Sequence, residues 1–117
     1  MKSAVNTVAV AATAASEQLV SPPQLIVASP RGGGRLFALL RATTRIGRDL
    51  GNDLVLNSDL VSRRHAVVRI EGDVVLLEDL DSSNGTWVNG ARVRRRVLSD
   101  RDLIEFGECV VRFLRGR

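Results

Sequence analysis

Short apolar runs separated by turn-forming residues make up this chain from Gln24 onward, with a turn signal roughly every eight to twelve residues. No segment of this region keeps a helical spacing of apolar residues over about eleven positions. Short strands with this punctuation form sandwiches or barrels, so we predict an all-β fold. The chain has 117 residues, which is enough for a single domain.

Two tight turns are the clearest local signals. Residues 65–71 alternate apolar and polar side chains, and Gly72-Asp73 then leads into a second strand-like segment, 74–79, which begins with four apolar residues; together they predict a hairpin. Asn89-Gly90 is the strongest two-residue hairpin signal in the chain. Further strands are expected at 25–28, 35–40, 43–47, 54–56, 86–88, 91–93, 103–106 and 109–114.

Residues 1–23 differ from the rest because they are rich in Ala and Thr and end in Ser21-Pro22-Pro23. We expect a flexible tail here and a folded domain over 24–117. A secretory leader is the alternative, but polar residues interrupt the apolar run. No stretch has the length of a transmembrane helix, so we expect no membrane partner.

Cys109 is the only cysteine, which excludes an intramolecular disulfide and a multi-cysteine metal site. It lies in an apolar run, so a buried structural thiol is expected, and a reducing cytoplasm follows as the simplest localisation.

His65 is the only histidine and follows Ser62 by three residues. No Gly-x-Ser-x-Gly motif surrounds Ser62, and His65 with Cys109 gives at most two metal ligands. We therefore predict no enzyme, no metal and no cofactor.

The basic residues are almost all arginine, Lys2 being the one lysine among 17, and the formal net charge is +4. A guanidinium matches phosphate oxygens two at a time, which favours an anionic partner, although a general preference for Arg explains the composition equally well. The Arg92–Arg96 cluster suggests nucleic-acid binding as the alternative function. It also fits a charged edge strand that resists aggregation.

Three predicted loops carry donors suited to an anion. They contain Gly47-Arg48, Val61–His65 and Ser82–Gly85, and loops at one end of a sandwich gather in space. A guanidinium, hydroxyls and an amide would suit a phosphate. The same residues could instead serve only as turns, and spacing alone leaves that open.

The ordered set Gly47-Arg48, Ser62-x-x-His65, Asn84-Gly85-Thr86 and Asn89-Gly90 resembles the forkhead-associated (FHA) domain, from about Leu25 to Leu114. The resemblance implies a β-sandwich of about eleven strands that binds phosphothreonine in a partner protein. By the family pattern, Arg48 and Ser62 hold the phosphate, while Arg63 and Ser83 lie near the phosphate or the peptide. Asn84 bonds the ligand backbone, and Gly47, His65 and Gly85 support the site.

The resemblance also implies an adaptor in Ser/Thr-kinase signalling, and together with the arginine usage it leads us to expect a standalone bacterial protein. The expected partner is a threonine-phosphorylated protein, either a kinase or a kinase substrate. The chain's own tail is a further candidate partner, through phosphorylation of Thr7 or Thr13. By the same resemblance, Leu60 falls in the loop that selects residues flanking the phosphothreonine, and as an apolar residue it gives no preference based on charge.

Overall fold

Eleven strands in two sheets make up the computed structural model, which describes residues 21–29 and 32–116. Most of the expected tail, including Thr7 and Thr13, lies outside the described residues. The strands are β1 (Gln24–Ala28), β2 (Gly34–Ala38), β3 (Thr43–Gly47), β4 (Leu54–Val55), β5 (Ala66–Glu71), β6 (Val74–Asp79), β7 (Thr86–Val88), β8 (Ala91–Val93), β9 (Arg95–Val97), β10 (Leu103–Phe106) and β11 (Cys109–Leu114).

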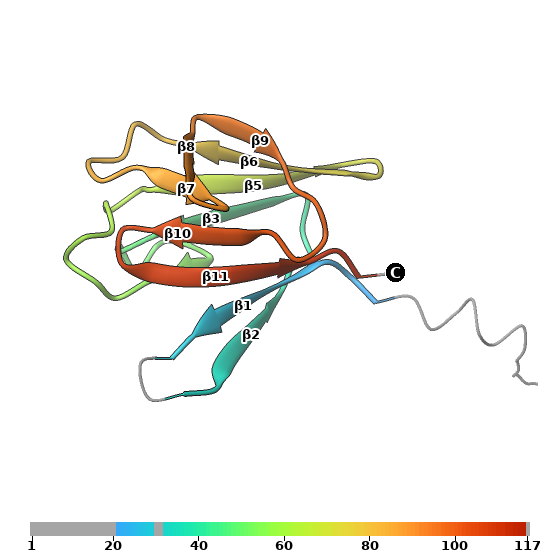
Figure 1. The fold of residues 1–117 in the computed structure, drawn as a ribbon, viewed down its shortest axis with the longest axis horizontal. Helices are drawn as coiled ribbons and strands as arrows, with labels where there is room; N and C mark the ends of the chain where they lie inside the picture. Colours follow the sequence, from blue (N-terminus) through green and yellow to red (C-terminus); the bar gives the residue numbers. More distant parts are fainter. Residues whose placement is uncertain (1–20, 30–31, 117) are drawn as a thin grey trace, which may run out of the picture.

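The sheets pack face to face as a sandwich (Figure 1). One sheet has the order β2-β1-β11-β10-β7-β8 and the other the order β4-β3-β5-β6-β9. The described pairs are antiparallel except for β3 with β4. The predicted all-β sandwich is therefore confirmed. No helix in residues 21–29 and 32–116 is long and apolar enough to cross a bilayer.

Alternation along the strands builds the core between the sheets. On β5, Ala66 and Val68 are 0% and 1% exposed and face the opposite sheet, as the sequence pattern predicts. Phe106 and Phe113 supply the large side chains from the other layer and are fully buried. Most of the remaining core consists of Val, Leu and Ile, whose branched side chains pack well on pleated surfaces.

The two predicted tight turns are also present. Asn89 and Gly90 have φ values of 51° and 85°, so both central residues of the β7–β8 turn take the left-handed conformation that this hairpin type requires. Gly72 has a φ of 61° between β5 and β6. These turns fix the register of both hairpins.

Cys109 is half-buried, whereas the sequence led us to expect a buried thiol. It begins β11 beside the exposed Glu108 and is partly buried against the core. Burial raises the pKa of the thiol, and the Glu108 carboxylate raises it further. A protonated, weakly reactive thiol follows from this environment.

The loops that carry the candidate anion-binding residues lie at the left end of the sandwich in Figure 1, whereas β1 begins and β11 ends at the right. The two described chain ends are close together. An added Cβ on Gly116 would lie 2.5 Å from the carbonyl oxygens of Ser21 and Pro22. The site and the two ends of the described domain, Ser21 and Gly116, therefore lie at opposite ends of the sandwich.

Candidate functional site

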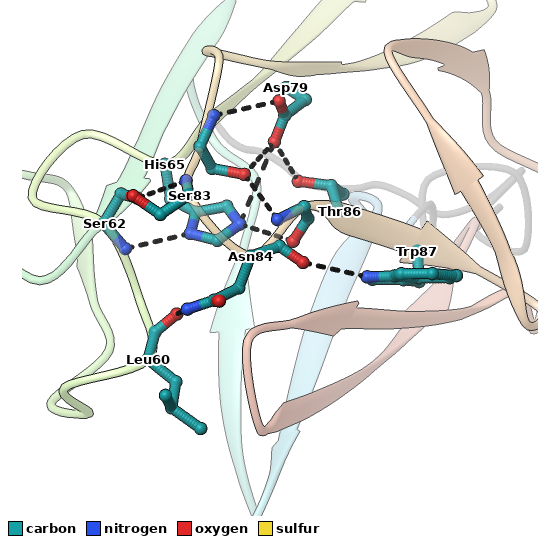
Figure 2. Close-up of polar contacts among 10 residues, drawn as sticks. Leu60, Ser62, His65, Asp79, Ser83, Asn84, Thr86 and Trp87 are labelled. Carbon is teal, nitrogen blue, oxygen red and sulfur yellow. Dashed lines mark hydrogen bonds and ion pairs between the residues drawn. The ribbon is translucent and has the colours of Figure 1, made fainter.

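Three loops meet at one end of the sandwich, and hydrogen bonds to Ser62 join them. The Arg48 N–H donates to the Ser62 carbonyl at 3.0 Å, which joins the β3–β4 loop to the β4–β5 loop. The Ser83 N–H donates to Ser62 Oγ at 3.0 Å, which brings in the β6–β7 loop (Figure 2). The gathering of these loops that the sequence predicts is present in the structure.

The Arg48 side chain is fixed at Nε, while the outer end of its guanidinium is open. Its side chain is half-buried, and Nε donates to the Val61 carbonyl at 3.0 Å. Within the described residues, its two terminal nitrogens have no hydrogen-bond partner. A guanidinium fixed in this way presents donors without a large further loss of side-chain freedom when an anion binds.

Gly47 allows the close approach that positions Arg48. A Cβ at this residue would lie 2.2 Å from the Arg63 carbonyl oxygen and 2.8 Å from Asn52 Nδ2. The Asn52 amide donates to the Arg63 carbonyl at 2.7 Å and to the Asp49 carbonyl at 2.9 Å. Asn52 thus clamps two of the loops together, and only glycine fits beneath the clamp.

His65 ties two loops to the sandwich and is fully buried. Its Nδ1 accepts the Ser62 N–H at 3.1 Å, and its Nε2 lies 2.9 Å from the Gly85 carbonyl. Because Nδ1 is an acceptor, the ring proton must be on Nε2, and the imidazole is neutral. Burial lowers the pKa of His65, and this outweighs the opposite effects of Gly85 and Asp79. With both nitrogens engaged, His65 is not placed to act as a base toward Ser62 Oγ.

Asp79 organises the β6–β7 loop from the end of β6. Its carboxylate accepts the Ser82 N–H at 3.1 Å, the Ser82 hydroxyl at 2.6 Å and the Thr86 hydroxyl at 2.7 Å. Ser82 Oγ in turn accepts the Gly85 N–H at 3.0 Å. Burial raises the pKa of Asp79, but the hydrogen bonds from Ser82 and Thr86 outweigh it, and the net pKa is lowered. The loop is therefore built around an ionised carboxylate.

Asn84 connects the β6–β7 loop to the β4–β5 loop at the surface. Its side-chain Nδ2 donates to the Leu60 carbonyl at 2.8 Å, and its backbone carbonyl accepts the Trp87 indole N–H at 3.1 Å (Figure 2). The Ser83 and Asn84 side chains are exposed next to Ser62. The amide oxygen of Asn84 has no hydrogen-bond partner among the described residues, so it can accept from a ligand backbone.

The structure thus brings Arg48, Ser62, Ser83 and Asn84 to one surface. Arg63 belongs to the same loops through its backbone, since its carbonyl accepts the Asp49 N–H at 3.2 Å. Its side chain is exposed and bonds none of the other candidate residues. Arg63 therefore contributes positive charge beside the site rather than a fixed donor.

Gly85 needs both its backbone conformation and the space beside it. Its φ is 87°, and a Cβ would lie 2.6 Å from Arg92 Nε. We expect Gly85→Ala to lower the free energy of unfolding by about 1–2 kcal/mol, about 1 kcal/mol of it from the positive φ. Gly72→Ala is the matched control because its φ is 61° and no atom lies within 4 Å.

Chemical denaturation of both glycine variants measures this difference. A Gly85→Ala variant that also carries Arg92→Ala should recover to the level of the Gly72→Ala control, since the contact with Arg92 is gone. Equal destabilisation by the two single variants would mean that Arg92 moves aside without cost.

Sequence reasoning missed the residues that hold the loops from behind, above all Asp79 and Asn52. Asp79 precedes Ser82 by three residues, a spacing at which a carboxylate can accept a nearby backbone N–H. That signal could have been found. The clamp at Asn52 could not, because it depends on the Arg63 carbonyl, 11 residues further along the chain.

Comparisons with known proteins identify the family of this chain. The family model of the FHA domain matches residues 44–107. The FHA domain-containing protein FhaA of Mycobacterium tuberculosis is 43% identical over 83 residues, which cover 69% of this chain and 16% of FhaA. The glycogen accumulation regulator GarA of Mycolicibacterium smegmatis is 39% identical over 102 residues, which cover 86% of this chain and 64% of GarA. The chain spans only part of the length of these relatives.

A solved structure described as an analysis of phosphothreonine-dependent FHA domain interactions superimposes with a TM-score of 0.70 and 36% identity. The match covers 78% of this chain and 95% of that one. The family model covers more than half of the chain and includes all three loops of the site. The chain belongs to the FHA domain family.

Proposed function

We propose that this chain is a phosphothreonine-dependent protein-binding module that acts as an adaptor in Ser/Thr-kinase signalling. The observation that carries the proposal is the hydrogen bonding of the Ser62 hydroxyl. Its Oγ accepts the Ser83 N–H and donates to no other described residue, and the carbonyl of the preceding residue, Val61, holds Nε of Arg48, so an available hydroxyl proton and the open end of the guanidinium belong to the same pair of loops. A donor hydroxyl next to a fixed guanidinium is complementary to a phosphate, which carries about −1.5 to −2 charges and three acceptor oxygens.

Each candidate residue has a role in this proposal. Arg48 and Ser62 bind the phosphate, and Ser83 adds a hydroxyl at its edge. Asn84 accepts from the peptide backbone through its amide oxygen, since its Nδ2 is held by the Leu60 carbonyl. Arg63 adds attraction for the dianion from the exposed side of the loop. The family membership and the phosphothreonine-dependent structural neighbour support the same ligand class.

The partner that we propose is a threonine-phosphorylated protein, in a cytoplasm that keeps Cys109 reduced. Binding rather than catalysis is supported by His65, which is buried and has both ring nitrogens engaged. The nucleic-acid alternative gains no support from the Arg92–Arg96 cluster. The cluster is divided between two strands, β8 and β9, and these are edge strands of different sheets.

A phosphothreonine peptide library tests the proposal. We expect selected peptides to bind with micromolar dissociation constants, equivalent to about −8 kcal/mol, and their unphosphorylated forms to show no measurable binding. Isothermal titration calorimetry on matched phosphorylated and unphosphorylated pairs gives the comparison. Equal binding of the two forms, or no binding of any phosphopeptide, would refute the proposal.

A further inference from the structure

An open groove of about 670 Å³ lies on the outer face of the five-stranded sheet, next to the three loops of the site but outside it. Its walls include Arg45 on β3, Arg64 before β5 and the turn around Leu50. Ile46 is buried on the inner face of β3, and its neighbour Arg45 points outward, which places the groove on the side away from the core. The lining does not include Arg48, Ser62, Ser83 or Asn84, the residues of the candidate phosphate site.

The groove has an apolar floor and apolar rims. Val67 faces outward on β5, yet it is only 4% exposed and lies in the groove lining. Leu50 and Leu80 line the groove from two of the site loops and are 89% and 41% exposed. Large exposed leucines grouped around a hollow mark surfaces that bind other proteins.

Two arginines whose side chains have no partner among the described residues border this apolar surface. The side chains of Arg45 and Arg64 form no hydrogen bond or ion pair within the described residues. Arg69, also in the lining, is paired with Glu78. Asp49 is the one carboxylate in the lining among the residues that the structure describes. Two arginines against one carboxylate leave the groove positive, which suits an acidic ligand.

The groove and the phosphate site share a border. Arg64 follows Arg63 directly, and Asp49 and Leu50 belong to the loop that begins with Arg48. A partner that places a phosphothreonine at Ser62 therefore brings its neighbouring chain close to the groove. A second contact made by an already tethered chain adds to the overall affinity through its effective concentration.

We propose that this groove is a second docking site, which binds an acidic segment with an apolar side chain in the same phosphorylated partner. The apolar side chain packs on Val67 between Leu50 and Leu80, and the carboxylates pair with Arg45 and Arg64. The proposal rests on the proposed function because the phosphothreonine supplies the first anchor. It defines the partner more narrowly, as a phosphoprotein with an acidic, leucine-bearing segment near the phosphosite.

Calorimetry with peptides of two lengths tests this inference. A short phosphothreonine peptide is compared with versions extended on either side by a flexible spacer and an Asp/Glu/Leu segment. We expect one extended peptide to bind wild type about 10-fold more tightly than the short peptide. In Arg45→Glu this gain should disappear, while affinity for the short peptide changes by less than about 2-fold.

Arg41→Glu is the matched control because Arg41 is exposed, precedes the other end of β3 and lies outside the groove lining. It should retain the full gain, and thermal unfolding of all variants confirms that they fold. Equal binding of short and extended peptides, or a gain that survives Arg45→Glu, would overturn the docking site alone. Failure of the short phosphopeptide to bind wild type would overturn the proposed function, and this inference with it.

Discussion

The Arg48→Ala variant is expected to lose phosphopeptide binding almost completely while it keeps its fold. The open end of this guanidinium can make two charge-assisted hydrogen bonds to a phosphate, each worth about 1.5–3 kcal/mol. Removing both therefore costs about 3–6 kcal/mol, which corresponds to a loss of affinity of more than about 100-fold. Calorimetry with a selected phosphothreonine peptide measures the loss.

Ser62→Ala should weaken the same complex less, by about 10- to 150-fold, because one charge-assisted bond is removed. It also leaves the Ser83 N–H without its acceptor, at a cost of about 1 kcal/mol in the free energy of unfolding.

Arg41→Ala is the control for a change of charge, since this exposed residue lies far from the loops at the other end of β3. Undiminished affinity in Arg48→Ala or Ser62→Ala would show that the phosphate binds elsewhere.

The second large effect is expected on stability, from the replacement of His65. This side chain is fully buried, bonds Ser62 and Gly85, and lies edge-on to Phe106 with ring centroids 5.6 Å apart. His65→Ala removes two hydrogen bonds and opens a cavity, so we expect a loss of about 3 kcal/mol in the free energy of unfolding. Urea denaturation measures it, and His65→Gln provides a milder replacement if the alanine variant fails to fold.

The same histidine makes stability depend on pH, with a definite sign. The pKa of His65 in the folded chain is below its ordinary value of 6.5, chiefly because of burial. As pH falls below about 6.5, the unfolded chain takes up a proton that the folded chain does not, and stability decreases. The contribution is complete above that pH and is lost progressively below it.

Because His65 is the only histidine, the decrease in stability just below pH 6.5 should vanish in His65→Gln. A decrease of the same size in the variant would assign this pH dependence to another group. The lowered pKa of Asp79 acts in the same direction at lower pH, where protonation of this carboxylate removes its contribution.

The sequence predicted the parts of this fold that depend on neighbours along the chain. Alternation over residues 65–71 located β5, and the Asn89-Gly90 dipeptide located the turn between β7 and β8. Both signals are local, because side-chain direction in a strand repeats every two residues and a turn of this type needs residues that accept a positive φ.

Features that depend on distant pairing could not be predicted from local patterns. The Arg92–Arg96 cluster reads as one charged edge strand, but the chain changes sheets at Arg94, with Arg92 on β8 and Arg95 and Arg96 on β9. The Arg94 carbonyl accepts the Asp79 N–H at 2.8 Å, a contact set by the position of β6. Likewise, the groove beside Arg45 depends on loops that the sequence separates widely.

The placement of the two ends of the described domain has a consequence for architecture. Ser21 and Gly116 lie side by side at the end of the sandwich opposite the binding loops. A domain of this kind can be spliced into a surface loop of another protein with little disturbance to its host, since entry and exit points nearly coincide. It can equally be tethered to a sensor chip by either end with its recognition face directed into solution.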